Sequence, residues 1–269
     1  MTESTNKKGI AYSCYYNTSR DGENFVAEHT LSYQVSGSLT LNDGHREYPS
    51  SVGSLRLIRR NQLMKFLKKP AEDEAFKSIS IYLDQETLKH FAQEHHIKAI
   101  SGQVKKPVLN LTSTLLLEKY IHSIKDYLQA DSFDDKALVE VKLKEGILLL
   151  IKSNPEVIDV LFDFSEPYKA DLESFMNLNY HFNVKLERFA YMTGRSLATF
   201  KRDFEKQFST SPGKWIMHKR LDEAYRLITE KGKSGSDVYL DLGFEDMSHF
   251  SFAFKKQFGV SPSKVVVKF

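Results

Sequence analysis

Basic and hydroxyl-bearing side chains are interspersed with phenylalanine in two segments, FKRDFEKQFSTSP at 200–212 and FSFAFKKQFGVSP at 250–262. Seven of the thirteen aligned positions are identical. Lysine and arginine bind anions such as phosphate, and serine and threonine hydroxyls hydrogen bond to the same oxygens. The chemistry that these residue types favour is therefore recognition of an anionic partner.

Each segment must be a helix if its phenylalanines, which recur every fourth residue, are to form one buried stripe. The stripes comprise Phe200, Phe204 and Phe208 in the first copy and Phe250, Phe254 and Phe258 in the second. The opposite face carries Ala198, Thr199, Lys201, Arg202 and Glu205 in the first copy and Ser248, His249, Ser251 and Lys255 in the second. The buried half repeats while the outward half differs, as expected of two copies of one scaffold that read two different surfaces.

A short helix, a glycine turn and a second helix make up each unit. Gly194 stops the first helix and Ser196 caps the next, while Gly243 and Asp246 take these places in the second unit. This arrangement is a helix-turn-helix, whose second helix can enter the major groove of DNA. A connecting helix of about 18 residues from Pro212 would span roughly 27 Å, close to the roughly 34 Å between successive major grooves on one face of DNA.

The segment from about residue 170 to the C-terminus resembles the DNA-binding domain of the AraC/XylS family of bacterial transcription regulators. The resemblance is carried by ERFAYMTGRSLATFKRDFEKQFSTSPGKWI and DLGFEDMSHFSFAFKKQFGVSP. It implies double-stranded DNA and RNA polymerase as partners, and activation rather than repression. The DNA-contacting residues that it implies are Arg195, Ala198, Thr199, Lys201, Arg202, Ser248, His249, Ser251 and Phe252.

Two positions depart from the family pattern, both in the second unit. Phe252 stands where the family commonly has arginine, so it either touches a thymine methyl group or is buried. Tyr239 stands where a small residue usually lets the two helices approach, a place that Ala190 fills in the first unit. We therefore expect the first unit to carry more of the sequence specificity.

Residues 9–83 show the alternation and turn signals of short strands, which predict a sandwich or barrel, and residues 84–163 show helical periodicity. This part looks like the cupin-type effector-binding or dimerisation domain of the same family. The middle helices either pack on the strands or pair with a second copy of the chain. The predicted fold is α+β, with domains at 1–166 and 167–269, the second all helical with its two helix-turn-helix units joined by a long helix.

Composition agrees with two domains in a reducing compartment. The chain has 269 residues, 41% of them hydrophobic, and a single cysteine, Cys14. We expect a cytoplasmic protein that does not enter a membrane, because we find no signal segment and no apolar run near 20 residues. From Tyr168 onward there are 17 Lys and Arg against 12 Asp and Glu, so an anionic partner belongs to this part.

An enzyme is the distant alternative. His29, His45 and Glu47 are the metal-ligand candidates near one another in the strand region, without a His-x-His pair, and Cys14 resembles a buried small residue more than a nucleophile. There is no serine nucleophile motif and no glycine-rich phosphate loop. We predict no enzymatic activity, no metal and no cofactor. The alternative function that remains to be tested is that of a metal-dependent cupin enzyme.

The signal that controls the regulator stays open at this point. The N-terminal domain is expected to bind a small-molecule effector, but control by a protein partner or by homodimerisation alone fits the same residues. Aromatic and basic side chains that could line a pocket for an anionic or sugar-like ligand, or could equally be core and surface, are Tyr33, Arg56, Arg59, Phe66 and Tyr82.

Overall fold

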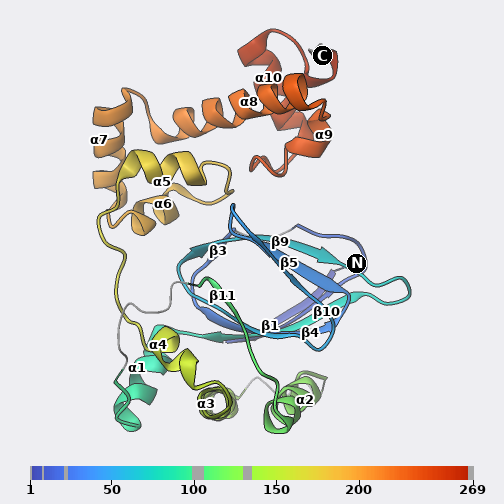
Figure 1. The fold of residues 1–269 in the computed structure, drawn as a ribbon, viewed down its shortest axis with the longest axis vertical. Helices are drawn as coiled ribbons and strands as arrows, with labels where there is room; N and C mark the ends of the chain where they lie inside the picture. Colours follow the sequence, from blue (N-terminus) through green and yellow to red (C-terminus); the bar gives the residue numbers. More distant parts are fainter. Residues whose placement is uncertain (1, 8, 21–23, 99–105, 130–134, 266–269) are drawn as a thin grey trace. The chain divides into compact units, whose positions relative to one another are not determined.

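A computed structural model describes every residue except 1, 8, 21–23, 99–105, 130–134 and 266–269 (Figure 1). The chain divides into two compact units, residues 1–165 and 166–269. The first unit combines strands with helices and the second is helical, which confirms the predicted α+β class.

A six-stranded antiparallel sheet forms the middle layer of the N-terminal unit, in the order β1-β2-β10-β4-β7-β11. Its strands are β1 (Thr2–Lys7), β2 (Ile10–Tyr15), β4 (His29–Ser36), β7 (Leu55–Ile58), β10 (Phe76–Leu83) and β11 (Val108–Asn110). Alternating residues of β4 divide between its two faces, because successive side chains of a strand point to opposite sides. Leu31 and Tyr33 face the helices, while Thr30, Ser32 and Gln34 face the smaller sheets and are buried as well.

Two smaller sheets, β6-β5-β9 and β3-β8, lie on one face of the six-stranded sheet, opposite the helices (Figure 1). Their strands are β3 (Phe25–Val26), β5 (Ser38–Asn42), β6 (Glu47–Ser50), β8 (Gln62–Leu63) and β9 (Lys65–Lys69). A core that includes Leu41, Met64 and Phe76 joins the layers. The sandwich form of the prediction is confirmed, and no closed barrel forms within the described residues.

Helices cover the other face of the large sheet and contribute the larger core. They are α1 (Gln85–Glu94), α2 (Leu115–Gln129), α3 (Lys136–Ser153), the 3-10 turn η1 (Pro155–Val157) and α4 (Ile158–Leu161). Asp84 and Asp135 cap α1 and α3 by accepting hydrogen bonds from backbone N–H groups. One apolar stripe of α2 is buried at Leu117, Tyr120 and Ile121, in keeping with the helical periodicity predicted for this part of the chain.

The sequence analysis was wrong at β1 and β11, which lie outside the predicted strand region of residues 9–83. β11 interrupts the stretch read as helical, where its three residues are too few to show a period. It forms because Val108–Asn110 pair with Ile58–Arg56 of β7. Long-range pairing of this kind overrides local pattern.

The second unit contains α5 (Leu172–Asn179), α6 (Leu186–Met192), α7 (Leu197–Phe208), α8 (Pro212–Lys231), α9 (Gly235–Val238), α10 (Met247–Phe258) and the 3-10 turn η2 (Pro262–Lys264). The long α8 lies between two groups of shorter helices, with α7 near its start and α9 and α10 near its end (Figure 1). Within the ranges that the structure describes, no helix has the length and apolar character needed to cross a membrane.

Candidate nucleic-acid interface

The first helix-turn-helix consists of α6 and α7, joined by a turn at Gly194 and Arg195. Gly194 has a φ of +63°, and a Cβ there would lie 2.7 Å from the carbonyl carbon of Tyr168, so only glycine fits this turn. The Ser196 hydroxyl then accepts a hydrogen bond of 3.2 Å from the Thr199 N–H, which caps α7. The predicted cap and turn are confirmed at these residues.

Aromatic packing fixes the orientation of α7. Phe200 and Phe204 are fully buried and Phe208 is half-buried. The Trp215 ring, at the start of α8, lies 5.6 Å from the Phe204 ring and 5.3 Å from the Phe208 ring, measured between centroids. Because the phenylalanine stripe is held against α8, the opposite face of α7 points to solvent.

The second helix-turn-helix, formed by α9 and α10, repeats this arrangement at the other end of α8. Asp246 caps α10 by accepting from the His249 N–H at 2.6 Å, and Gly243 holds a φ of +85° in the preceding turn. Phe250 and Phe254 are fully buried, and Tyr225 of α8 lies 4.7 Å from the Phe258 ring. The helix before the turn is shorter than its counterpart: α9 has four residues where α6 has seven.

The outward faces carry the residues predicted to contact DNA. Exposed are Ala198, Lys201, Arg202, Ser248, His249 and Phe252, and half-buried are Thr199 and Ser251. The Arg202 side chain is 76% exposed and Phe252 is 71% exposed. Of the two possibilities for Phe252, burial is therefore wrong, and contact with a partner remains.

Arg195 differs from the other predicted residues, because its guanidinium is engaged within the protein. The side chain is 8% exposed, with Nε 3.2 Å from a carboxylate oxygen of Asp203. Nη1 donates to the carbonyl oxygens of Ala170 and Thr193 at 3.0 and 2.8 Å. The guanidinium holds the pKa of Asp203 below its usual value. As a DNA contact Arg195 stays a prediction, and these bonds favour a positioning role.

Sequence reasoning missed Arg220, which joins the two helix-turn-helix motifs within residues 166–269. From α8 its guanidinium donates to the carbonyl oxygens of Tyr180 and Phe182, both at 2.8 Å, and of Gly243 at 2.6 Å. The first two precede α6, and the third lies in the turn before α10. Burial lowers the pKa of Arg220 to about 10, so it stays charged at neutral pH. No periodicity marks this residue, since its role depends on where two distant turns meet.

The electrostatics of the outward faces favour an anion. The cap of α7, Ser196, is neutral and its first turn has no acidic residue, so the positive end of that helix dipole is uncompensated, whereas the Asp246 carboxylate lies at the start of α10. Lys201 and Arg202 are exposed on α7, and Lys255 and Lys256 are exposed near the end of α10. The arrangement can bind phosphate groups with main-chain N–H groups and cations together.

The metal-ligand candidates of the N-terminal unit do not form a site. His29 is buried, and burial lowers its pKa to about 3, whereas His45 and Glu47 are exposed. Among the described side chains, no three His, Cys, Asp or Glu residues gather around a common point.

Two family models match the chain in the order of its units. Residues 29–160 match the ExsA N-terminal regulatory domain, and residues 189–266 match a helix-turn-helix domain. The transcriptional regulator ExsA of Pseudomonas aeruginosa is 25% identical over 260 residues, covering 94% of this chain and 91% of its own length. The virulence regulon transcriptional activator VirF of Yersinia enterocolitica is 24% identical over 250 residues, which cover 89% of this chain and 90% of VirF.

Among solved structures, a variant of apo ToxT from Vibrio cholerae aligns with 96% of this chain and 97% of its own at 15% identity, with a TM-score of 0.48. The models describe both parts of the chain, and the regulators align with nearly all of it. The chain therefore belongs to the AraC/XylS family of DNA-binding transcription regulators.

Proposed function

We propose that this regulator is a transcription activator that recognises a bipartite DNA site with α7 and α10. The observation that carries the proposal is the pair of capped helices, α7 and α10. The buried phenylalanines of each helix pack against the long helix α8, and the opposite face of each helix is turned to solvent. The 20 residues of α8 extend about 30 Å, which suits recognition helices in neighbouring major grooves. The name of VirF, a transcriptional activator, supports the direction of control.

Selection of bound sequences from a random DNA pool tests this proposal. The expected product is one site with two conserved blocks about one helical turn apart. Selection of no sequence, or of one block alone, would contradict bipartite recognition.

The two helix-turn-helix motifs are expected to contribute unequally to the specificity for a DNA sequence. Arg202→Ala removes an exposed guanidinium that can pair with a guanine edge, and should weaken binding to the selected site roughly tenfold or more. Ser251→Ala removes a half-buried hydroxyl and should have a smaller effect. A mobility-shift titration of both variants measures the difference.

Arg226→Ala is the matched control for charge, because Arg226 is exposed on α8 and paired with Glu223 and Glu230. It should bind almost like the unaltered protein. Equal losses for Arg202→Ala and Ser251→Ala would contradict the unequal division.

Control by a small-molecule effector is the second part of the proposal. A cavity of about 690 Å³ lies between the sheets of the N-terminal unit, within the usual size range of ligand pockets. Phe66 and Tyr82, both named as possible pocket residues, line it together with hydroxyls such as Ser32 and Ser78. Comparison of selected-site binding with and without candidate effectors tests this part.

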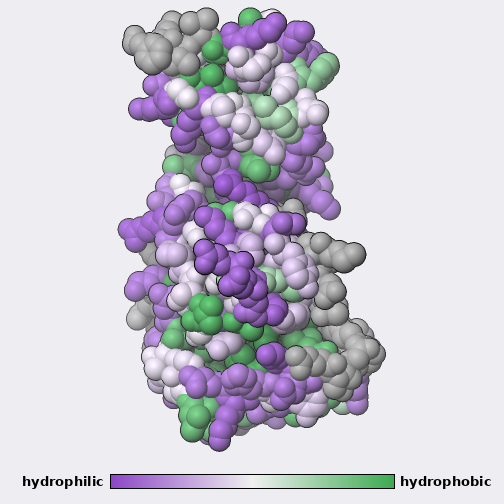
Figure 2. Space-filling model, turned by 90° about the vertical axis from the view of Figure 1, so that its right-hand side faces the viewer, coloured by the Kyte–Doolittle hydropathy of each residue, from purple (hydrophilic) through white to green (hydrophobic). Residues whose placement is uncertain are grey.

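Homodimerisation through the middle helices is the third part. Val141 and Leu148 of α3 are seven residues apart and exposed, Val141 to 61%. Leu115 and Leu116 of α2 are exposed as well. On the face of the N-terminal unit drawn in Figure 2, hydrophobic residues gather in one region. A second copy of the chain covering such residues would remove them from water.

The double variant Val141→Glu/Leu148→Glu should therefore be monomeric at concentrations at which the unaltered chain is dimeric, because carboxylates would be buried at the interface. Sedimentation velocity measures this. Val52→Glu, at an equally exposed valine in a turn, should leave the dimer intact. An unaltered chain that sediments as a monomer would end this part of the proposal.

A further inference from the structure

Hydroxyl-bearing side chains form one wall of the cavity of about 690 Å³ in the N-terminal unit. They lie on the face of the six-stranded sheet that is turned to the smaller sheets, where a sandwich ordinarily packs apolar side chains. Ser13 of β2 is the direct cross-strand partner of Ser78 of β10, and Ser80 of β10 is that of Ser32 of β4. Three neighbouring strands therefore present one continuous patch of hydroxyls to the cavity.

Three of these hydroxyls have no hydrogen-bond partner. Within the part of the chain that the structure describes, no group bonds to the hydroxyl of Ser13, Ser32 or Ser78. Unlike the unpartnered nitrogens of His29 and Arg60, which are fully enclosed, these hydroxyls line open space. Ser32 and Ser78 are only 3% and 4% exposed, and buried polar groups normally have a hydrogen-bond partner. A bound molecule that forms hydrogen bonds with this patch would supply one.

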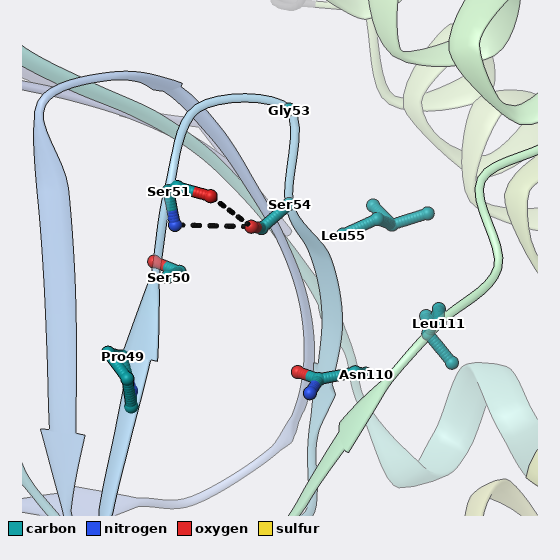
Figure 3. Close-up of a pocket in the computed structure, with 8 residues that line it drawn as sticks. All are labelled: Pro49, Ser50, Ser51, Gly53, Ser54, Leu55, Asn110 and Leu111. Atoms are coloured by element: carbon teal, nitrogen blue, oxygen red, sulfur yellow. Dashed lines mark hydrogen bonds between the residues drawn. The ribbon is translucent and has the colours of Figure 1, made fainter.

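The serines of a second hollow provide the contrast. A cleft of about 410 Å³ lies between the end of β6, the turn that follows it, the start of β7 and the end of β11 (Figure 3). There the Ser50 hydroxyl donates to the Leu39 carbonyl oxygen at 3.0 Å, and the Ser54 hydroxyl accepts from the Ser51 N–H at 3.2 Å. Because the protein itself provides partners for these serines, they do not call for a ligand, whereas those of the cavity do.

The facing wall of the cavity is apolar. It is formed by residues of the smaller sheets, namely Phe25, Val26, Leu39 and Phe66. A ligand that matches both walls carries hydroxyl groups on one side and hydrocarbon on the other. Sugars and polyols combine the two, because each of their hydroxyl groups is attached to a carbon that also bears hydrogen. A purely hydrocarbon ligand would leave the serine hydroxyls unpaired.

The charged side chains at the cavity favour a neutral ligand over an anion. Lys68 is half-buried, and its Nζ donates to the Tyr15 hydroxyl at 2.9 Å and lies 4.1 Å from the centre of that ring. The Glu28 carboxylate would repel an anion but can accept hydrogen bonds from hydroxyl groups. Arg56 and Arg59, which could have lined a pocket for an anion, are not among the described residues that line this cavity.

We propose that the effector is a neutral polyhydroxylated molecule, a sugar or polyol, whose hydroxyl groups bond to Ser13, Ser32 and Ser78. Its hydrocarbon side packs on Phe25 and Phe66. This inference rests on effector control, the second part of the proposed function, and adds the chemical class of the ligand and the residues that select it.

Thermal unfolding of the full chain with a panel of neutral monosaccharides, disaccharides and polyols tests the ligand class. Each compound is added at millimolar concentration, at which the general exclusion of sugars from protein surfaces has little effect. Decanoate and benzoate are the anionic comparison. A compound that binds the cavity should raise the midpoint by about 5–10 °C when present at about a hundred times its dissociation constant. Neither carboxylate should raise it.

Ser32→Ala/Ser78→Ala removes two of the hydroxyls. Without ligand this variant should unfold at or above the midpoint of the unaltered chain, because it removes buried polar groups that have no partner. It should need roughly tenfold or more of the responding sugar for the same shift, since two hydrogen bonds to the ligand are lost. Ser54→Ala, at a serine of the cleft in Figure 3, is the matched control and should keep the full response.

Two results would overturn the assignment. In the first, no sugar or polyol of the panel raises the midpoint of the unaltered chain, or a carboxylate alone does. In the second, Ser32→Ala/Ser78→Ala responds as strongly as Ser54→Ala, which would mean that the sugars bind elsewhere or act on the protein as a whole.

Effector control is measured separately, by titrating the selected DNA site with and without the responding sugar. A midpoint shift without a change in DNA affinity would contradict control while the ligand class stands. A carboxylate that changes DNA affinity, with no response to any sugar, would contradict the ligand class while control stands.

Discussion

Replacing Arg220 with methionine is expected to destabilise the helical unit, residues 166–269, by about 3–5 kcal/mol, because each buried acceptor left without its donor costs about 1–3 kcal/mol. The variant leaves the carbonyl oxygens of Tyr180, Phe182 and Gly243 without their donor. A domain of about 100 residues loses 4–8 °C of melting temperature per kcal/mol, so the midpoint should fall by roughly 15 °C or more. Calorimetry of the full chain measures this change.

The same substitution should also weaken DNA binding below the unfolding temperature. Arg220 fixes the turn before α10 relative to the residues that precede α6, so its loss frees the two recognition helices to move relative to each other. Affinity for the bipartite site should then fall toward that for a single block, because the second contact is no longer pre-positioned. Arg226→Met, at an exposed residue of the same helix, should change neither property appreciably. A stable Arg220→Met variant with full affinity would refute the bridging role.

Phe204→Ala is expected to cost about 3–5 kcal/mol, the usual loss for a fully buried phenylalanine. The ring contacts Phe200, Phe208 and Trp215, with centroids 5.5, 4.4 and 5.6 Å away, and truncation leaves a cavity among them. Phe254→Ala should cost about as much, because Phe254 has the equivalent position in the second copy and is equally buried. Chemical denaturation of both variants tests the equivalence.

Phe252→Ala makes a strict control, since it removes the same side chain from the same helix as Phe254 but at an exposed position. Its stability should be close to that of the unaltered chain. A large loss for Phe252→Ala, or a loss confined to one of the two buried positions, would show that the repeated sequence does not mean repeated packing.

The helical unit could be predicted closely because its signals are local. Ser196, Asp246, Gly194 and Gly243 act on the residues next to them, so caps and turns can be read without knowing the fold. The phenylalanine stripes are equally local, since their period is that of the helix itself.

The N-terminal unit could be predicted less well because its decisive contacts are distant in sequence. β11 exists through pairing with β7, about fifty residues earlier. Alternation on β4 marks two faces but does not say that the face with Ser32 and Gln34 is enclosed by other sheets. Arg56 alternates with Leu55 and Leu57 as a surface residue would, yet its side chain is 1% exposed and donates a hydrogen bond to the Tyr48 carbonyl oxygen on another strand.

Trp215 gives the molecule a built-in spectroscopic probe. It is the chain's single tryptophan, and its ring packs against Phe204 and Phe208, so intrinsic fluorescence excited at the indole band reports on the first helix-turn-helix alone. Unfolding of the first helix-turn-helix can therefore be followed by tryptophan emission without an attached label, while the second helix-turn-helix contributes no tryptophan signal.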